Sequence, residues 1–138
     1  MTRDILLARW SEVGDKIITM AEAFPEARYD ARPLPEVRSF TEQLRHVAFW
    51  NAYAGQTLRG EPADGEANEV PRDAYPTKAE IVPALRETFD AVKSELASRT
   101  PDAAQADTVI SFIEHGGEHY GQLAVYYRLS GLVPPASR

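Results

Sequence analysis

Residues 107–131 read DTVISFIEHGGEHYGQLAVYYRLSG, and the spacing of their apolar side chains decides the fold class. Residues of the apolar face recur at three- and four-residue intervals, which is the period of one side of an α-helix. This face comprises Val109, Ile113, Gly116, Tyr120, Leu123 and Tyr127. Gly131 suits the left-handed position after a helix end, and Pro134-Pro135 prevents the helix from resuming. The stretch therefore predicts a long amphipathic helix with one face in a core.

Three upstream segments show the same helical period, and no stretch alternates convincingly at period two. They span about residues 4–23, 39–60 and 77–98. Ser39 with Glu42, and Thr77 with Glu80, have the spacing of a capping box, which marks the starts of the second and third helices. These segments together predict an all-α domain over residues 1–138, an antiparallel or mixed four-helix bundle.

Two connections and one helix start are less regular. Residues 25–37 are rich in proline and charge, and are expected to lie across the bundle. Residues 61–76 form a proline-, glycine- and acid-rich loop, and a loop of this length is either mobile or functional. The fourth helix has two candidate starts, an N-cap at Thr100 with Pro101 as first helical residue, or a start near Asp107.

Composition narrows the classes of function. The 15 basic and 21 acidic residues give a net charge of −6, which argues against nucleic acid as a partner. No apolar run approaches the roughly 18 residues of a membrane-spanning helix, and the N-terminus lacks the features of a signal peptide. We therefore expect a cytoplasmic protein with no membrane association. Because cysteine is absent, any metal must be held by nitrogen and oxygen.

The chain contains only three histidines. His115 and His119 are four residues apart, so their imidazoles lie on one side of the fourth helix, beside its apolar face. A bundle could bring His46 of the second helix across to them. Three nitrogens would then hold a divalent ion and leave a position for water or substrate, as in catalytic metal sites. The alternative for the pair is a solvated or hydrogen-bonded polar face.

Five neighbours of these histidines are candidates for outer contacts or pocket walls. Gln122 and Tyr126 share the helix side of the histidine pair, and Trp50 and Tyr53 follow His46 by about one and two turns. Glu42 precedes His46 by one turn and could orient its imidazole, although capping explains this glutamate equally well. Core packing is the alternative for the aromatic residues. The pattern assigns no catalytic residue.

Several short motifs resemble those of the DinB-like superfamily, a group of small metal-binding helical bundles. Residues 118–123 (EHYGQL), then Tyr127-Arg128, Gly131 and residues 133–137 (VPPAS), resemble its C-terminal signature. Residues 29–33 (YDARP), 37–40 (VRSF) and 44–46 (LRH) look like its entry into the second helix. The resemblance covers essentially the whole chain. It implies an up-down-down-up four-helix bundle with a long crossover, in which His46, His115 and His119 match the metal triad.

The same resemblance implies several classes of activity. Relatives include transferases and isomerases that use low-molecular-weight thiols such as mycothiol or bacillithiol, and many members are labelled metal-dependent hydrolases. Nickel or zinc occupies the triad in several family structures, and dimers are common, which makes a homodimer the oligomeric state to test. The leading hypothesis is a metal-dependent enzyme that activates a thiol or water against a small electrophile near Trp50, Tyr53 and Tyr126.

Two hypotheses compete with an enzyme. One is a non-catalytic, metal-stabilised stress-response or binding module, because no convincing acid or base accompanies the histidines. The other is a plain helical interaction domain without metal, whose stability would be indifferent to zinc and nickel. Neither the substrate nor the thiol is selected by any residue of the sequence.

Overall fold

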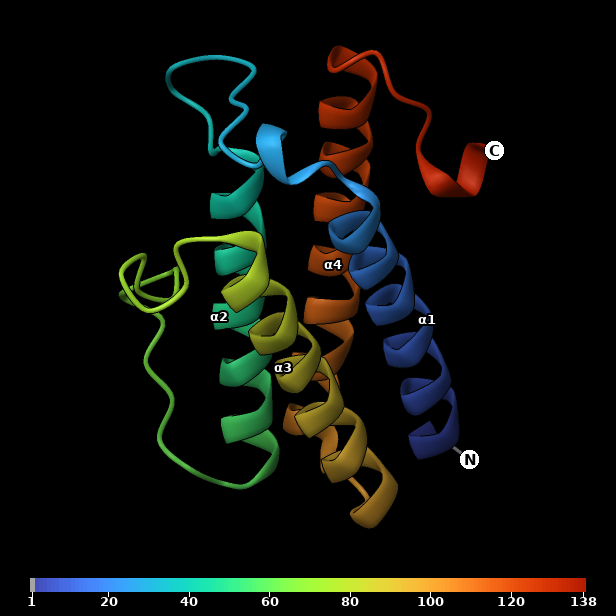
Figure 1. The fold of residues 1–138 in the computed structure, drawn as a ribbon. Coiled ribbons are helices and arrows are strands. Elements are labelled where there is room, and N and C mark those ends of the chain that lie inside the picture. The colour runs from blue at the N-terminus through green and yellow to red at the C-terminus, as the bar shows by residue number, and fades with distance from the viewer. Residues whose placement is uncertain (1) are drawn as a thin grey trace.

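The computed structural model describes residues 2–138 and consists mainly of four long helices (Figure 1). They are α1 (Thr2–Ala23), α2 (Phe40–Leu58), α3 (Lys78–Ser98) and α4 (Ala103–Leu129). Two short 3-10 helices, η1 (Glu26–Arg28) and η2 (Pro135–Ser137), follow α1 and α4. Residues 2–138 contain no strand. The predicted all-α, four-helix fold is confirmed.

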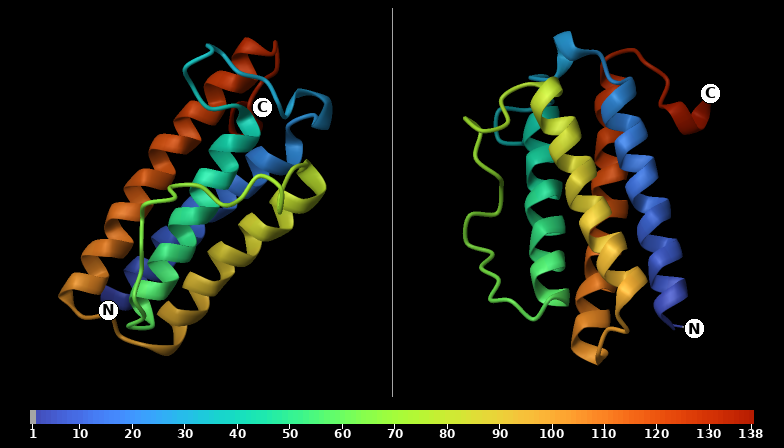
Figure 2. Two further views of the ribbon diagram at one scale, coloured as in Figure 1. Left: turned by 90° about the vertical axis from the view of Figure 1, so that its left-hand side faces the viewer. Right: turned by 60° about the horizontal axis from the view of Figure 1, so that its bottom comes forward.

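The helices run up, down, down and up, as Figures 1 and 2 show. The two parallel helices α2 and α3 are joined by residues 59–77, which return along the length of the bundle and are called the crossover loop here. Each of α2 and α1 packs against both α3 and α4. The topology implied by the resemblance is therefore confirmed, and it places the two histidine-bearing helices, α2 and α4, side by side.

The core is built from the apolar faces that the helical period predicts. Its largest fully buried side chains include Trp10, Ile17, Phe24, Phe40, Leu44, Ile81, Leu85, Leu96, Leu123 and Tyr127. Two of these side chains carry a polar group, and each is hydrogen-bonded. The Trp10 indole N–H donates to the carbonyl of Phe89 at 3.0 Å, and the Tyr127 hydroxyl donates to the carbonyl of Met20 at 2.6 Å. At Gly116 a Cβ would lie 2.9 Å from Cγ2 of Val13, so this glycine permits the close approach of α1 to α4. None of the described helices has the length and apolarity needed to cross a bilayer.

Helix starts differ in part from the predictions. Both predicted starts of α4 are wrong, because Asp102 is the N-cap. Its carboxylate accepts from the backbone N–H of Gln105 at 2.8 Å, and the Gln105 side chain accepts from the backbone N–H of Asp102 at 2.9 Å. This reciprocal pair satisfies two backbone donors at once, which Thr100 does not do here. At α2 only half of the expected pairing forms, since the Ser39 hydroxyl accepts from the backbone N–H of Glu42 at 3.2 Å while the Glu42 carboxylate pairs with Arg32.

Candidate metal centre

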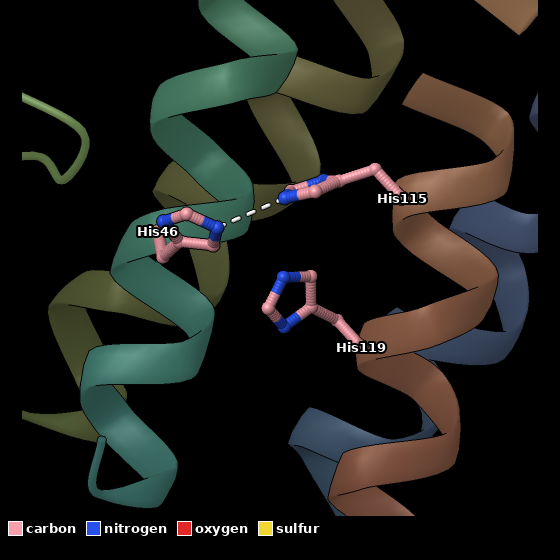
Figure 3. Close-up of side chains that lie close together, drawn as sticks. All are labelled: His46, His115 and His119. Atoms are coloured by element: carbon pink, nitrogen blue, oxygen red, sulfur yellow. Dashed lines mark hydrogen bonds between the residues drawn. The ribbon is translucent and has the colours of Figure 1, made fainter. Parts of the chain in front are cut away.

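The three histidines converge between α2 and α4 (Figure 3). His115 and His119 point from successive turns of α4 toward His46 on α2. One ring nitrogen from each residue lies within 4.8 Å of the other two, and Nε2 of His46 is 2.9 Å from Nε2 of His115. Nitrogen ligands about 2.1 Å from one ion lie roughly 3 to 3.4 Å apart, so the three rings could hold a metal with small side-chain adjustments.

Burial keeps these imidazoles uncharged at neutral pH. His46 and His119 are each only 6% exposed, and His115 is half-buried. Loss of hydration lowers the pKa of all three, to about 4 for His115 and about 3 for His119. Neighbouring imidazoles and Arg38 lower the pKa of His115 and His119 further. At His46 the hydrogen bond to Asn68 opposes the lowering and Arg38 adds to it. The neutral imidazole is the form that ligates metal, so the site is in its binding-competent protonation state across the neutral range.

Outer hydrogen bonds orient two of the three rings. Nδ1 of His46 lies 2.8 Å from the backbone carbonyl oxygen of Asn68, which can only accept, so this nitrogen carries the proton. Nδ1 of His119 donates to Oε1 of Gln43, whose Nε2 in turn donates to Oε1 of Gln122 at 2.8 Å. Both rings therefore turn an unprotonated Nε2 toward the centre, while no such outer partner holds His115 within residues 2–138.

Two of the orienting residues were not predicted from the sequence. Gln43 precedes His46 by three residues, so helix geometry places both on one side of α2, and the spacing could have identified it. Asn68 lies in the crossover loop, 22 residues after its partner His46. No local pattern signals a contact across such an interval.

An aromatic wall borders His46 and His115. Trp50 stacks on Phe112 with ring centroids 5.2 Å apart, and Tyr53 packs against both rings. The Trp50 indole N–H donates to Oδ1 of Asn68 at 2.7 Å. Phe112 completes this wall and was not among the predicted candidates.

The remaining candidates lie on the His119 side or outside the network. The Tyr126 hydroxyl donates to the carbonyl of Arg38 and receives a weaker contact from Nε2 of Gln43 at 3.4 Å. Burial raises the pKa of Tyr126. Glu42 forms its ion pair with Arg32, and no hydrogen bond connects it to His46 in the described chain. The Glu42 carboxylate therefore neither orients His46 nor forms its part of the expected capping box.

An open cleft of about 660 Å³ lies beside this network. It is lined by Arg32, Glu36, Val37, Arg38, Glu42, Gln43, Ala67, Asn68, Glu69 and Gln122. Three of these side chains, the carboxamides of Gln43, Asn68 and Gln122, belong to the hydrogen-bond network around the histidines. The aromatic residues expected near the substrate, Trp50, Tyr53 and Tyr126, do not line this cleft.

Comparison with known families agrees with the geometry. The model of the DinB superfamily matches residues 9–126, a range that includes all four helices in large part and all three histidines. No match was found among curated proteins. On the basis of this match and of its up-down-down-up bundle, the chain belongs to the DinB superfamily.

Proposed function

We propose that the protein is a metal-dependent enzyme whose His46, His115 and His119 hold one divalent ion, zinc or nickel. The observation that carries the proposal is the convergence of three neutral imidazoles, two of them with the tautomer set by outer hydrogen bonds. Three nitrogen donors without thiolate or carboxylate suit zinc and nickel. Such an ion, when bound, supplies a Lewis acid that turns a water or a low-molecular-weight thiol into a nucleophile at neutral pH.

The chain's own residues would bind and orient the reactants. The carboxamides of Gln43 and Gln122 and the guanidinium of Arg38 line the cleft and suit the polar part of a small substrate. The stacked rings of Trp50 and Phe112, which pack beside His46 and His115, would offer an apolar surface next to the ion. Because the chain lacks cysteine, a thiol nucleophile would come from a cosubstrate, giving a transferase, whereas water would give a hydrolase.

Metal content of the purified protein tests the site. Protein prepared without chelator should contain one equivalent of zinc or nickel by elemental analysis, and His46→Ala, His115→Ala and His119→Ala should each lose most of it. Glu118→Gln is a matched control, because Glu118 is an exposed residue of the same helix, next to His119. Single changes that leave the metal content untouched would overturn the proposed site, with circular dichroism confirming that each variant is folded.

Activity separates the enzyme from a binding module. The metal-loaded protein should conjugate an electrophile with a cellular thiol, or hydrolyse an ester, and the histidine variants should lose that activity. One observation favours a non-catalytic, metal-stabilised module as the second candidate: no carboxylate in residues 2–138 hydrogen-bonds to a triad imidazole, and Glu42 is paired with Arg32. Failure across a broad thiol and ester panel, with normal metal binding, would support this second candidate.

A further inference from the structure

We infer that Asn68 is a positioning residue that sets the tautomer and orientation of His46, so that the crossover loop forms part of the metal centre. The effect on metal affinity rests on the proposed metal-binding function. The two hydrogen bonds of Asn68 exist without metal. The backbone carbonyl of Asn68 accepts from Nδ1 of His46 at 2.8 Å, and its side-chain Oδ1 accepts from the Trp50 indole N–H at 2.7 Å. One loop residue therefore contacts two side chains of α2.

The conformation of Asn68 makes this double contact feasible. His46 and Trp50 are four residues apart, so they are neighbours on one side of α2 and lie within reach of a single residue. Asn68 has a φ of 58°, the only positive value at a non-glycine residue between residues 2 and 138. Asparagine tolerates this left-handed region better than other residues that carry a side chain. A strained backbone at a ligand contact is typical of a functional constraint.

Contacts on both sides of Asn68 hold residues 65–70, called the strap here, against α2. At Gly65 a Cβ would lie 2.6 Å from Cη2 of Trp50, so the strap backbone lies directly on the indole. Glu69 lies 3.5 Å from the guanidinium of Arg38 and 3.7 Å from that of Arg45. The backbone N–H of Val70 donates to the carbonyl of Arg45 at 3.3 Å. The position of the Asn68 carbonyl is thus determined by several contacts besides its own.

Loss of the strap would release His46. Without an acceptor at Nδ1, nothing selects the tautomer that leaves Nε2 free for a metal. Removing such an outer partner of a metal-ligating histidine typically weakens metal binding by about 10- to 100-fold. The bond between Asn68 and Trp50 acts on the metal only through His46, so its effect should be smaller than that of losing the imidazole itself.

Zinc affinity of four single variants of the full chain tests the inference, measured by competition with a chromophoric chelator. Asn68→Ala removes the side-chain acceptor and strains the backbone, and should weaken zinc binding by about 10-fold or more. Asn68→Gly removes the hydrogen bond to Trp50 without straining the backbone and should give a smaller loss. Trp50→Phe removes the same bond together with the indole packing on Gly65 and Phe112, and should lose at least as much affinity as Asn68→Gly. Asn68→Asp keeps an acceptor and tolerates the positive φ, so it should remain within about threefold of the wild type.

Two further measurements distinguish positioning from general stability. In the double variant Trp50→Phe/Asn68→Gly the loss should be smaller than the sum of the two single losses, because both substitutions remove the same bond. In metal-free protein, imidazole ¹⁵N shifts should show a protonated Nδ1 at His46 in the wild type and a mixed tautomer in Asn68→Ala; only three histidines need assignment. Asn51→Ala, which removes a different side-chain hydrogen bond of α2, to Thr88, should change neither shift nor affinity.

The outcomes separate the two proposals. A wild-type protein that binds no zinc overturns the proposed function and, with it, the role of Asn68 at a metal. If the wild type binds zinc and Asn68→Ala retains both wild-type affinity and the His46 tautomer, only the inference on Asn68 is overturned. An unfolding temperature that falls in Asn68→Ala without a change in tautomer would likewise leave Asn68 a purely structural residue.

Discussion

His46 and His119 are equally buried, each 6% exposed, yet they are oriented by different kinds of partner. His119 donates to the side chain of Gln43, which lies on helix α2 inside the bundle. His46 donates to the backbone of Asn68, which belongs to the crossover loop. A ring held by packed helices depends on the core, whereas a ring held by a loop depends on the contacts that seat the loop. The comparison teaches that the candidate metal centre takes one of its orienting contacts from the helical bundle and the other from a loop.

Removing the ligands themselves should have the largest effect. His46→Ala and His119→Ala should each weaken zinc binding by more than about 100-fold, because the loss exceeds that of any outer partner. Competition titration measures both losses. Equal losses would show that His46 and His119 contribute equally to zinc affinity. A variant that keeps wild-type affinity would remove that histidine from the site.

Acid should lower the stability of the metal-free protein through the lowered pKa values of its buried histidines. In the folded protein the pKa of His119 is about 3 and that of His115 about 4, both below the ordinary value of about 6.5 in an unfolded chain. Above pH 6.5 both states are neutral, so these histidines add no pH dependence. Below pH 6.5 these histidines take up protons in the unfolded chain but stay neutral in the folded protein. Protonation therefore stabilises the unfolded state, and the free energy of unfolding falls by about 2 kcal/mol for each of the two histidines by pH 5.

Urea unfolding of the metal-free protein at pH 7 and at pH 5 measures this loss. His119→Gln removes one of the titrating groups and should show a smaller difference between the two pH values than the wild type. A wild-type stability that is the same at both pH values would contradict the lowered pKa values. Zinc should remain bound to the folded protein below pH 6.5, since protons compete for these imidazoles only near their lowered pKa.

Changes at Gln43 should affect the orientation of His119 and not that of His46. Gln43→Leu keeps the volume but leaves the Nδ1 proton of buried His119 without an acceptor, which should weaken zinc binding by about 10-fold or more and cost about 1 to 3 kcal/mol of stability. Gln43→Glu retains an acceptor and should lose less affinity. Competition titration and urea unfolding measure the two effects. If Gln43→Leu loses stability but no affinity, the orienting bond to His119 is dispensable for metal.

The smallest effect should come from Glu42. Its carboxylate pairs with Arg32, whose side chain is exposed, and does not contact His46. Glu42→Gln should therefore leave zinc affinity unchanged and alter stability by less than about 1 kcal/mol, as for other surface ion pairs. A tenfold loss of zinc affinity in this variant would show that Glu42 does orient His46.

Much of this architecture could be predicted from the sequence. The helical period identified all four helices, and α3 begins and ends where the Thr77 cap and the third apolar face predict. The start of α4 was missed because the proline signal pointed to Thr100 as the N-cap, whereas Asp102, the residue after Pro101, forms the capping pair with Gln105. His46, His115 and His119 were identified as one group by residue type and spacing, and the structure brings them together.

What the sequence by itself determined is local: which segments are helical, which faces are apolar, and which three residues can offer imidazole nitrogen. Periodicity and capping act over a few residues, so they can be read along the chain. Only the tertiary structure decided how the imidazoles are oriented, because the partners of His46 and His119 lie 22 and 76 residues away in sequence. The contact of His46 depends on the parallel arrangement of α2 and α3, because the crossover loop that joins them carries Asn68 along α2. The contact of His119 depends on the packing of α4 beside Gln43.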